Sequence, residues 1–199
     1  MKKLSDTTLY LMVWGILGLF ILSSCSDERK TKAELEDLYG RAVTINLSEM
    51  ECRHSAVDTI PVDDNLKAKF TFVNFVDTTQ CSPCTLNKMY QWNKYIEKLR
   101  KKGVKFVFIF EPSKALLEDV YLSIESSGLK NPIYVDTSYV FSKDNDFIPQ
   151  DAKYHSFLLD DEGQIIIVGN PLLNQKVEKL IDPQKLPNGL PGVLRTTCS

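Results

Sequence analysis

The chain has 199 residues and carries 24 lysines and arginines against 26 aspartates and glutamates, so its formal charge at pH 7 is −2. This balance excludes a nucleic-acid-binding protein that depends on bulk positive charge. Hydrophobic residues make up 43% of the chain and charged residues 25%, which excludes a disordered chain and a membrane protein with many spans. We therefore expect one globular domain, with enough chain to build a core without disulfide staples.

The N-terminus has the pattern of an export signal. Two lysines precede an apolar run from Leu9 to Leu22, which closes with Leu22-Ser23-Ser24-Cys25. The run is shorter than the roughly 20 residues that a permanent membrane span needs, so we expect residues 1–24 to be removed. The closing residues resemble the bacterial lipobox, which implies that Cys25 becomes the first residue and carries a lipid. The alternative is an ordinary secretory signal in which Cys25 is incidental.

The segment after the signal links this anchor to the domain. Residues 25–34 are polar and charged, as in a short tether, and residues 35–66 form an N-terminal extension with a brief strand at 42–45. The expected location is the cell envelope, lipid-anchored to a membrane and facing the periplasm or the exterior. Disulfides persist there, and thiols stay reduced only where electrons are supplied.

The order of the remaining elements predicts a mixed sheet. Aromatic and β-branched residues fill two strand-like runs, and apolar residues at helical spacing follow each of them. Strand, helix and strand in succession indicate parallel pairing, whereas Asp160-Asp161-Glu162-Gly163 is a turn of hairpin length. In chain order, we expect a strand at 67–76, a helix of about 18 residues ending at Gly103, a strand at 104–110, a helix at 112–127, a strand at 131–135, an irregular segment at 137–153, antiparallel strands at 155–159 and 164–168, a helix at 172–181 and a tail at 183–199.

This order, with Cys81-Ser82-Pro83-Cys84 between the first strand and its helix, resembles the thioredoxin fold over residues 67–182. It is more narrowly similar to the membrane-anchored, extracytoplasmic thioredoxin-like reductases of bacteria, on the strength of the N-terminal extension, Asn74 and the hairpin that begins at Phe157. The resemblance implies an α/β class, with a central mixed sheet flanked by helices. It also implies a redox-active disulfide.

The chemistry of the motif follows from its spacing. Residues i and i+3 at a helix start are about 5–6 Å apart, within the Cα separation that a disulfide requires. Unsatisfied N–H groups there favour a thiolate and lower a cysteine pKa below about 8.5. Cys81 is expected to be the nucleophile, and Cys84, one turn in and more buried, the resolving thiol. Pro83 suits the first helical turn, and Ser82 tunes the stability of the reduced thiolate.

The sequence also departs from the family pattern. By register with Phe157, the position of the usual cis-proline falls at Tyr154 or His155, and Gln80 replaces the aromatic residue that usually precedes the first cysteine. An imidazole near Cys81 could lower the thiol pKa, relay a proton or complete a copper site with both thiolates. It could equally be a packed histidine with no role.

Other polar residues carry weaker expectations. Asn74 is expected to bond to backbone as a buried group, and Glu111 could accept a proton, although a solvated carboxylate fits its position better. His54 is expected to have no role, and Cys52 could pair with Cys198. No second Cys-x-x-Cys exists to complete a zinc site.

The leading hypothesis is a thiol:disulfide oxidoreductase that acts as a reductant. Its expected partners are protein disulfides or thiols, a membrane electron donor and the membrane itself, with no nucleic acid and no cofactor or metal. The alternatives are a copper metallochaperone that uses Cys81, Cys84 and His155, and a binding module with a static disulfide. A peroxidase is a weaker alternative, because the threonine and arginine partners that such enzymes use have no evident counterpart here.

Overall fold

The computed structural model describes residues 29–57 and 68–181, so the expected signal peptide, Cys25 and the tail at 183–199 lie outside the described residues. The chain divides into two units, residues 1–37 and 38–199. In the first unit, residues 29–37 are helical. Two ion pairs each join residues one helical turn apart, Lys30 to Glu34 and Lys32 to Glu36, with a nitrogen–oxygen distance of 3.9 Å in both. Across residues 29–57 and 68–181, no helix combines the length and the apolarity that a membrane span requires.

The second unit is built on a six-stranded mixed sheet with the order β1-β4-β3-β2-β5-β6. Strands β2, β3 and β4 are parallel, whereas β1 and the hairpin of β5 and β6 run antiparallel to their neighbours. Gly163 has φ +79° in the hairpin turn, as its sequence predicts. The strands are β1 (Glu51–Arg53), β2 (Phe70–Val76), β3 (Val104–Phe110), β4 (Ile133–Val135), β5 (Ser156–Leu159) and β6 (Ile165–Val168).

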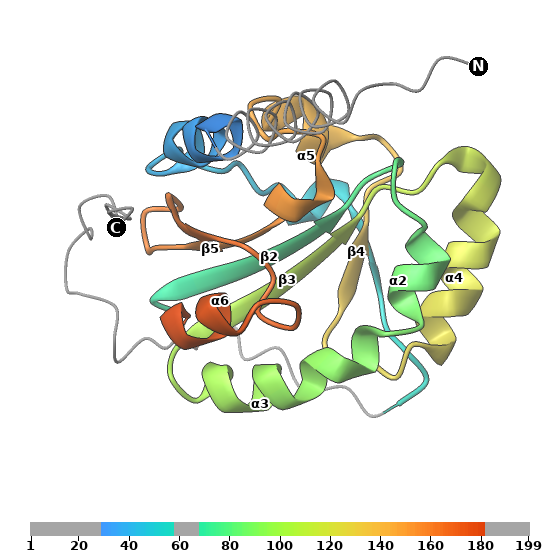
Figure 1. The fold of residues 1–199 in the computed structure, drawn as a ribbon. Coiled ribbons are helices and arrows are strands. Elements are labelled where there is room, and N and C mark those ends of the chain that lie inside the picture. The colour runs from blue at the N-terminus through green and yellow to red at the C-terminus, as the bar shows by residue number, and fades with distance from the viewer. Residues whose placement is uncertain (1–28, 58–67, 182–199) are drawn as a thin grey trace, which may run out of the picture. The chain divides into compact units, whose positions relative to one another are not determined.

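Helices cover both faces of the sheet (Figure 1). The main core lies between the sheet and helices α2, α3, α4 and α6. The apolar faces of these helices, with Leu86 from α2, Ile96 from α3 and Ile124 from α4, pack against alternate side chains of β2 and β3. On the opposite face, Phe75 packs on Phe141 of α5 with ring centroids 4.7 Å apart. The helical elements are η1 (Leu47–Glu49), α2 (Ser82–Leu86), η2 (Met89–Trp92), α3 (Asn93–Arg100), η3 (Lys114–Leu116), α4 (Leu117–Ser126), α5 (Val140–Asp144), η4 (Ala152–Tyr154) and α6 (Gln175–Leu180).

This topology confirms the expected thioredoxin-like α/β fold, with four local differences. The continuous helix of the prediction is broken into α2, η2 and α3. Strand β1 lies in the N-terminal extension at a place where no strand was expected, and the brief strand at 42–45 is reduced to one bridge between Ala42 and Gln164. Helix α5 lies within the segment expected to be irregular.

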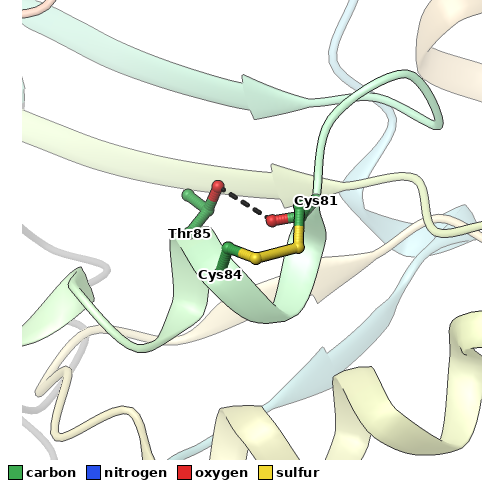
Figure 2. The surroundings of a disulfide bond; sticks show 3 residues. All are labelled: Cys81, Cys84 and Thr85. Carbon is green, nitrogen blue, oxygen red and sulfur yellow. Dashed lines mark hydrogen bonds between the residues drawn. A yellow bond between two sulfur atoms is a disulfide. The ribbon is translucent and has the colours of Figure 1, made fainter.

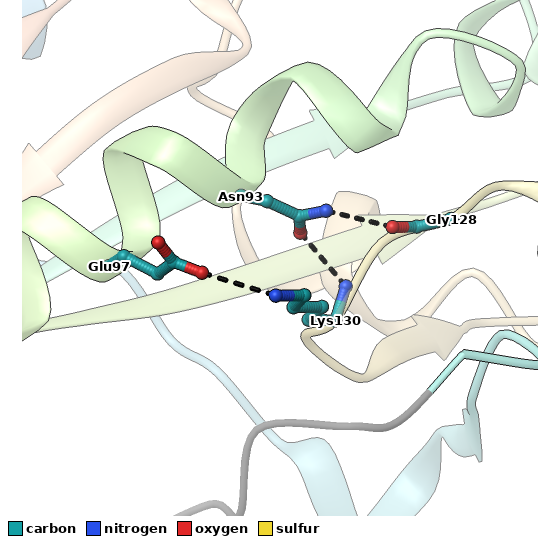
Figure 3. A network of polar contacts seen from close by, with 4 residues as sticks. All are labelled: Asn93, Glu97, Gly128 and Lys130. Atoms are coloured by element: carbon teal, nitrogen blue, oxygen red, sulfur yellow. Dashed lines mark hydrogen bonds and ion pairs between the residues drawn. The ribbon is translucent and has the colours of Figure 1, made fainter.

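Asn93 joins the start of α3 to the loop that follows α4 (Figure 3). Its Nδ2 donates to the Gly128 carbonyl at 2.8 Å, and its Oδ1 accepts from the Lys130 N–H at 2.9 Å. The Lys130 ammonium reaches Glu97 at 3.2 Å on the exposed side. One side chain thus satisfies two backbone groups of a connecting loop.

Candidate redox site

The two cysteines of the motif lie at the carboxyl edge of the central strand. Strand β2 ends at Val76, the loop 77–80 follows, and Cys81 is the residue that caps α2. Cys81 and Cys84 form a disulfide with their Cα atoms 5.3 Å apart (Figure 2). The spacing of the motif therefore places the two sulfurs in reach of each other, as the sequence predicts.

Both cysteines are exposed to solvent, so Cys84 is not a buried thiol. The reason lies in which side of α2 faces the core. Ser82 and Leu86 are 1% and 0% exposed and share one face of the helix. At about 100° per residue, Cys84 then lies roughly opposite that buried face. The disulfide is accessible from solvent and is not a sealed structural cross-link.

The backbone around the disulfide forms a short helix start. The Thr85 N–H donates to the Cys81 carbonyl at 3.0 Å, and the Thr85 hydroxyl donates to the same oxygen at 3.2 Å (Figure 2). Since Pro83 has no N–H, the donors left in this first turn are the N–H groups of Ser82 and Cys84. Helix α2 has five residues, so its dipole supports a thiolate less than the long helix expected from the sequence would.

Buried polar groups lie on the strands beneath this face. Asn74 is 7% exposed, and its Nδ2 donates to the Ser156 hydroxyl at 2.7 Å. Its observed partner is thus a side chain on the neighbouring strand, where the sequence suggested backbone. The Ser82 hydroxyl is buried and has no hydrogen-bond partner among the described residues. Ser156 was missed because a serine at a strand start carries no signal of its own.

The position that the family resemblance gives to a proline is held by buried residues. Tyr154 and His155 are each 2% exposed, and all peptide bonds of the described residues are trans. The imidazole Nδ1 lies 3.0 Å from Nε2 of Gln80, and its Nε2 lies 2.8 Å from the Pro149 carbonyl oxygen. Lys153 Nζ lies 4.7 Å from the centre of the Tyr154 ring. Both ring nitrogens of His155 are therefore engaged, and neither is open to a metal.

Glu111 is buried, which corrects the expectation of a solvated carboxylate. It is 2% exposed because α5 covers it, and its Oε1 accepts from the Ser142 N–H at 2.8 Å. Burial raises the pKa of Glu111 from 4.5 to about 7, the Ser142 contacts lower it, and the Asp136 carboxylate raises it further. Asp136 is fully buried and accepts from the N–H groups of Ser138 and Phe141. Its place between a strand and a helix start is the one signal that could have identified it.

The remaining candidates lie away from the motif. Cys52 is a free, exposed cysteine in β1, and its Sγ lies 3.7 Å from Nε2 of His54. Burial raises the pKa of the Cys52 thiol. Its suggested partner Cys198 lies outside the described residues. Within residues 29–57 and 68–181, no group of three His, Cys, Asp or Glu side chains could hold a metal ion.

Comparison with known proteins adds a family to this geometry. The sequence profile of the Redoxin family matches residues 54–181. Among proteins of curated function, no sequence is significantly similar to this one. Cys81 and Cys84 lie within the residues that match this family.

Three solved structures illustrate the structural likeness. A thioredoxin-like protein in its oxidised form aligns with a TM-score of 0.48 and 16% identity over 72% of this chain and 96% of its own. A putative thiol:disulfide interchange protein DsbE from Chlorobium tepidum aligns with a TM-score of 0.46 and 17% identity, over 72% of this chain and 94% of its own. The thioredoxin domain of a thiol-disulfide oxidoreductase from Bacteroides vulgatus aligns with a TM-score of 0.44 and 18% identity, over 72% of this chain and 97% of its own. With TM-scores below 0.5, these likenesses carry no weight in the assignment.

Proposed function

The chain belongs to the Redoxin family, and on that premise we propose that it is a thiol:disulfide oxidoreductase that exchanges its Cys81–Cys84 disulfide with protein thiols. The observation that carries the proposal is the exposed disulfide at the start of α2. A disulfide that only holds a fold together gains nothing from lying on the surface, whereas an exchanging one must be reached by an attacking thiolate.

The reaction runs in two exchanges. The Cys81 thiolate attacks a client disulfide, forms a mixed disulfide and expels one client thiolate, which takes up a proton. Cys84 then attacks the Cys81 sulfur, restores the Cys81–Cys84 disulfide and releases the second client thiolate. Two electrons pass from the dithiol to the client, so a donor must reduce the disulfide again before the next cycle.

Cys81 is assigned the attacking role because of its place before the first helical turn. The N–H of Cys84 points out of that turn with no helical partner, and it can stabilise negative charge on the Cys81 sulfur. Cys84 is itself part of the helix. Because both residues are exposed, accessibility does not distinguish them, and the assignment rests on this placement.

We further propose that the protein works as a reductant in the cell envelope, anchored by a lipid on Cys25 and supplied by a membrane electron donor. The lipobox-like sequence before Cys25 supports the anchor. An oxidising compartment makes a continuous supply of electrons necessary for any dithiol that acts there.

The experiment that tests the exchange reaction is the trapping of mixed disulfides. The Cys84→Ser variant should accumulate protein mixed disulfides on Cys81 and lose turnover with insulin as substrate. The Cys81→Ser variant should lose both turnover and trapping while remaining folded. Full turnover in Cys81→Ser would refute the proposal, and trapping only in Cys81→Ser would reverse the two roles.

A further inference from the structure

Gln80, the residue before Cys81, makes a contact that the sequence does not suggest. Its Nε2 lies 3.0 Å from Nδ1 of His155 and 3.4 Å from Oδ1 of Asp77. Nε2 of His155 lies 2.8 Å from the Pro149 carbonyl oxygen, which can only accept. The hydrogen-bond network therefore assigns the proton of a neutral imidazole to Nε2, and leaves Nδ1 as the acceptor for Gln80.

The same contacts hold the loop in front of Cys81 at two points. Asp77 Oδ1 also accepts from the N–H and the hydroxyl of Thr79, at 3.0 and 2.7 Å, so the loop is tied to itself. Gln80 ties the loop to His155, which belongs to the segment before β5 and is 2% exposed. Two acceptors from different parts of the chain thus share the two N–H groups of one amide.

We propose that His155 is a positioning residue for Cys81: the neutral imidazole holds Gln80 in place, and protonation of Nδ1 releases Gln80 and the loop. The inference deepens the proposed function, on which it rests. A protonated Nδ1 would present a hydrogen to the Gln80 N–H groups. Rotating the amide would satisfy Nδ1 but turn the amide oxygen toward the Asp77 carboxylate. Neither orientation satisfies both neighbours.

Other titratable groups near His155 could also change the properties of Cys81 as the pH changes. Two carboxylates face it: Asp77 through Gln80, and Asp151, which interacts with it electrostatically and pairs with Lys153 at 3.0 Å. From β2, Phe75 packs on the imidazole with ring centroids 5.0 Å apart. Hydrogen bonds from Lys153 lower the pKa of Asp151, which moves its ionisation away from the pH range of the measurement.

Glu111 is the group that could confuse the measurement. Burial raises its pKa to about 7, and it lies on the same face of the sheet as Phe141, which packs on Phe75. We therefore place the test in a Glu111→Gln background. Cys84→Ser is added so that Cys81 is the one thiol in its peptide, and labelling is read by mass spectrometry on that peptide of the full chain.

The readout is the rate at which iodoacetamide alkylates Cys81 between pH 5 and 9. The parent should show two steps, the ionisation of the thiol and a second step that depends on His155. Gln80→Ala should remove the second step. At pH 9 it should also slow alkylation about fivefold, the factor that corresponds to the net free energy of one hydrogen bond. His155→Ala should behave in the same way. His155→Gln offers one acceptor and one donor but cannot titrate. It should therefore remove the second step of the pH profile, and its alkylation rate should be higher than that of His155→Ala.

The control is Asn93→Ala, which removes two hydrogen bonds to a loop away from the motif (Figure 3). It should lower stability and leave both steps of the profile. A second step that persists in His155→Gln, or a Gln80→Ala profile identical to the parent, overturns the inference. Alkylation needs no client, so a single-step profile in a protein that still traps clients would contradict this inference and leave the proposed function intact.

Discussion

Glu111 and Asp136 interact through their side chains at the carboxyl ends of the adjacent parallel strands β3 and β4. Both residues are buried, at 2% and 0% exposure, so the pair has little access to water. Taking a carboxylate out of water favours its neutral form, and a second carboxylate beside it adds to that preference. Glu111 therefore gives the protein a pH dependence of stability that an ordinary surface carboxylate would not.

Glu111→Gln should change how stability depends on pH. The folded pKa of about 7 lies above the ordinary value of 4.5, so the folded state holds a proton that the unfolded state has lost. Stability from this group is present below pH 4.5 and is lost as pH rises through 7. Glutamine keeps an oxygen for the Ser142 N–H and does not titrate. The variant should gain about 2 kcal/mol relative to the parent between pH 5 and pH 8.

Urea unfolding of the parent and of Glu111→Gln at both pH values measures this gain. Titrations common to both proteins cancel in the difference between them. A difference in unfolding free energy that is the same at pH 5 and pH 8 would show that Glu111 titrates as an ordinary carboxylate.

Ser156→Ala should destabilise the protein through Asn74. Removing the hydroxyl leaves the buried Asn74 amide without its observed acceptor, at a cost of about 1–3 kcal/mol. Ser126 is the control, because its hydroxyl is exposed on α4 and donates to carbonyl groups of its own helix. Ser126→Ala should stay within about 0.5 kcal/mol of the parent. Equal effects of the two substitutions on chemical unfolding would contradict the role of the Asn74–Ser156 bond.

Gly169→Ala should cost more than an alanine substitution at another glycine with positive φ. Gly169 has φ +134°, and a Cβ there would lie 2.8 Å from Cγ2 of Val177. Gly40 has φ +76° and nothing within 4 Å of such a Cβ. We expect a loss of about 1 kcal/mol for Gly40→Ala and a larger loss for Gly169→Ala, compared by thermal unfolding. The loss caused by Gly169→Ala should be smaller in a Val177→Ala background than in the parent, and an equal loss in both backgrounds would show that the clash is not the cause.

Cys25→Ala tests the proposed anchor. The full chain should partition into the detergent phase of a Triton X-114 extract when it is produced in a bacterium with a lipoprotein pathway, because an acyl chain buries many CH₂ groups. The variant should move to the aqueous phase. Identical partitioning of the two proteins would rule out a lipid on Cys25.

Much of the fold could be predicted from local sequence. The run of aromatic and β-branched residues at 104–110 corresponds residue for residue to β3, and the glycine in the hairpin turn has the positive φ expected of it. The breaks between α2, η2 and α3 could not be predicted. Leu86, Met89, Trp92, Ile96 and Leu99 are buried on one side whether the helix is continuous or broken, so both arrangements produce the same pattern.

The site was less accessible to sequence reasoning because its contacts are distant in the chain. The motif and its spacing identified Cys81 and Cys84, but the side of α2 that faces the core decides their exposure. Gln80 meets His155 across 75 positions, and Glu111 is buried by a helix that begins 29 residues later. Strand β1 has no aromatic or β-branched residue in Glu51-Cys52-Arg53 and is recognisable only from its pairing with β4.

Cys81 and Cys84 are proposed to exchange electrons with other proteins, and the reduction potential of the pair shows whether they can. Equilibration of the protein with glutathione or dithiothreitol buffers, read on the peptide that contains both cysteines, measures the potential. We expect a value in the catalytic range, between about −120 and −270 mV. A value below about −300 mV, typical of structural disulfides, would contradict it.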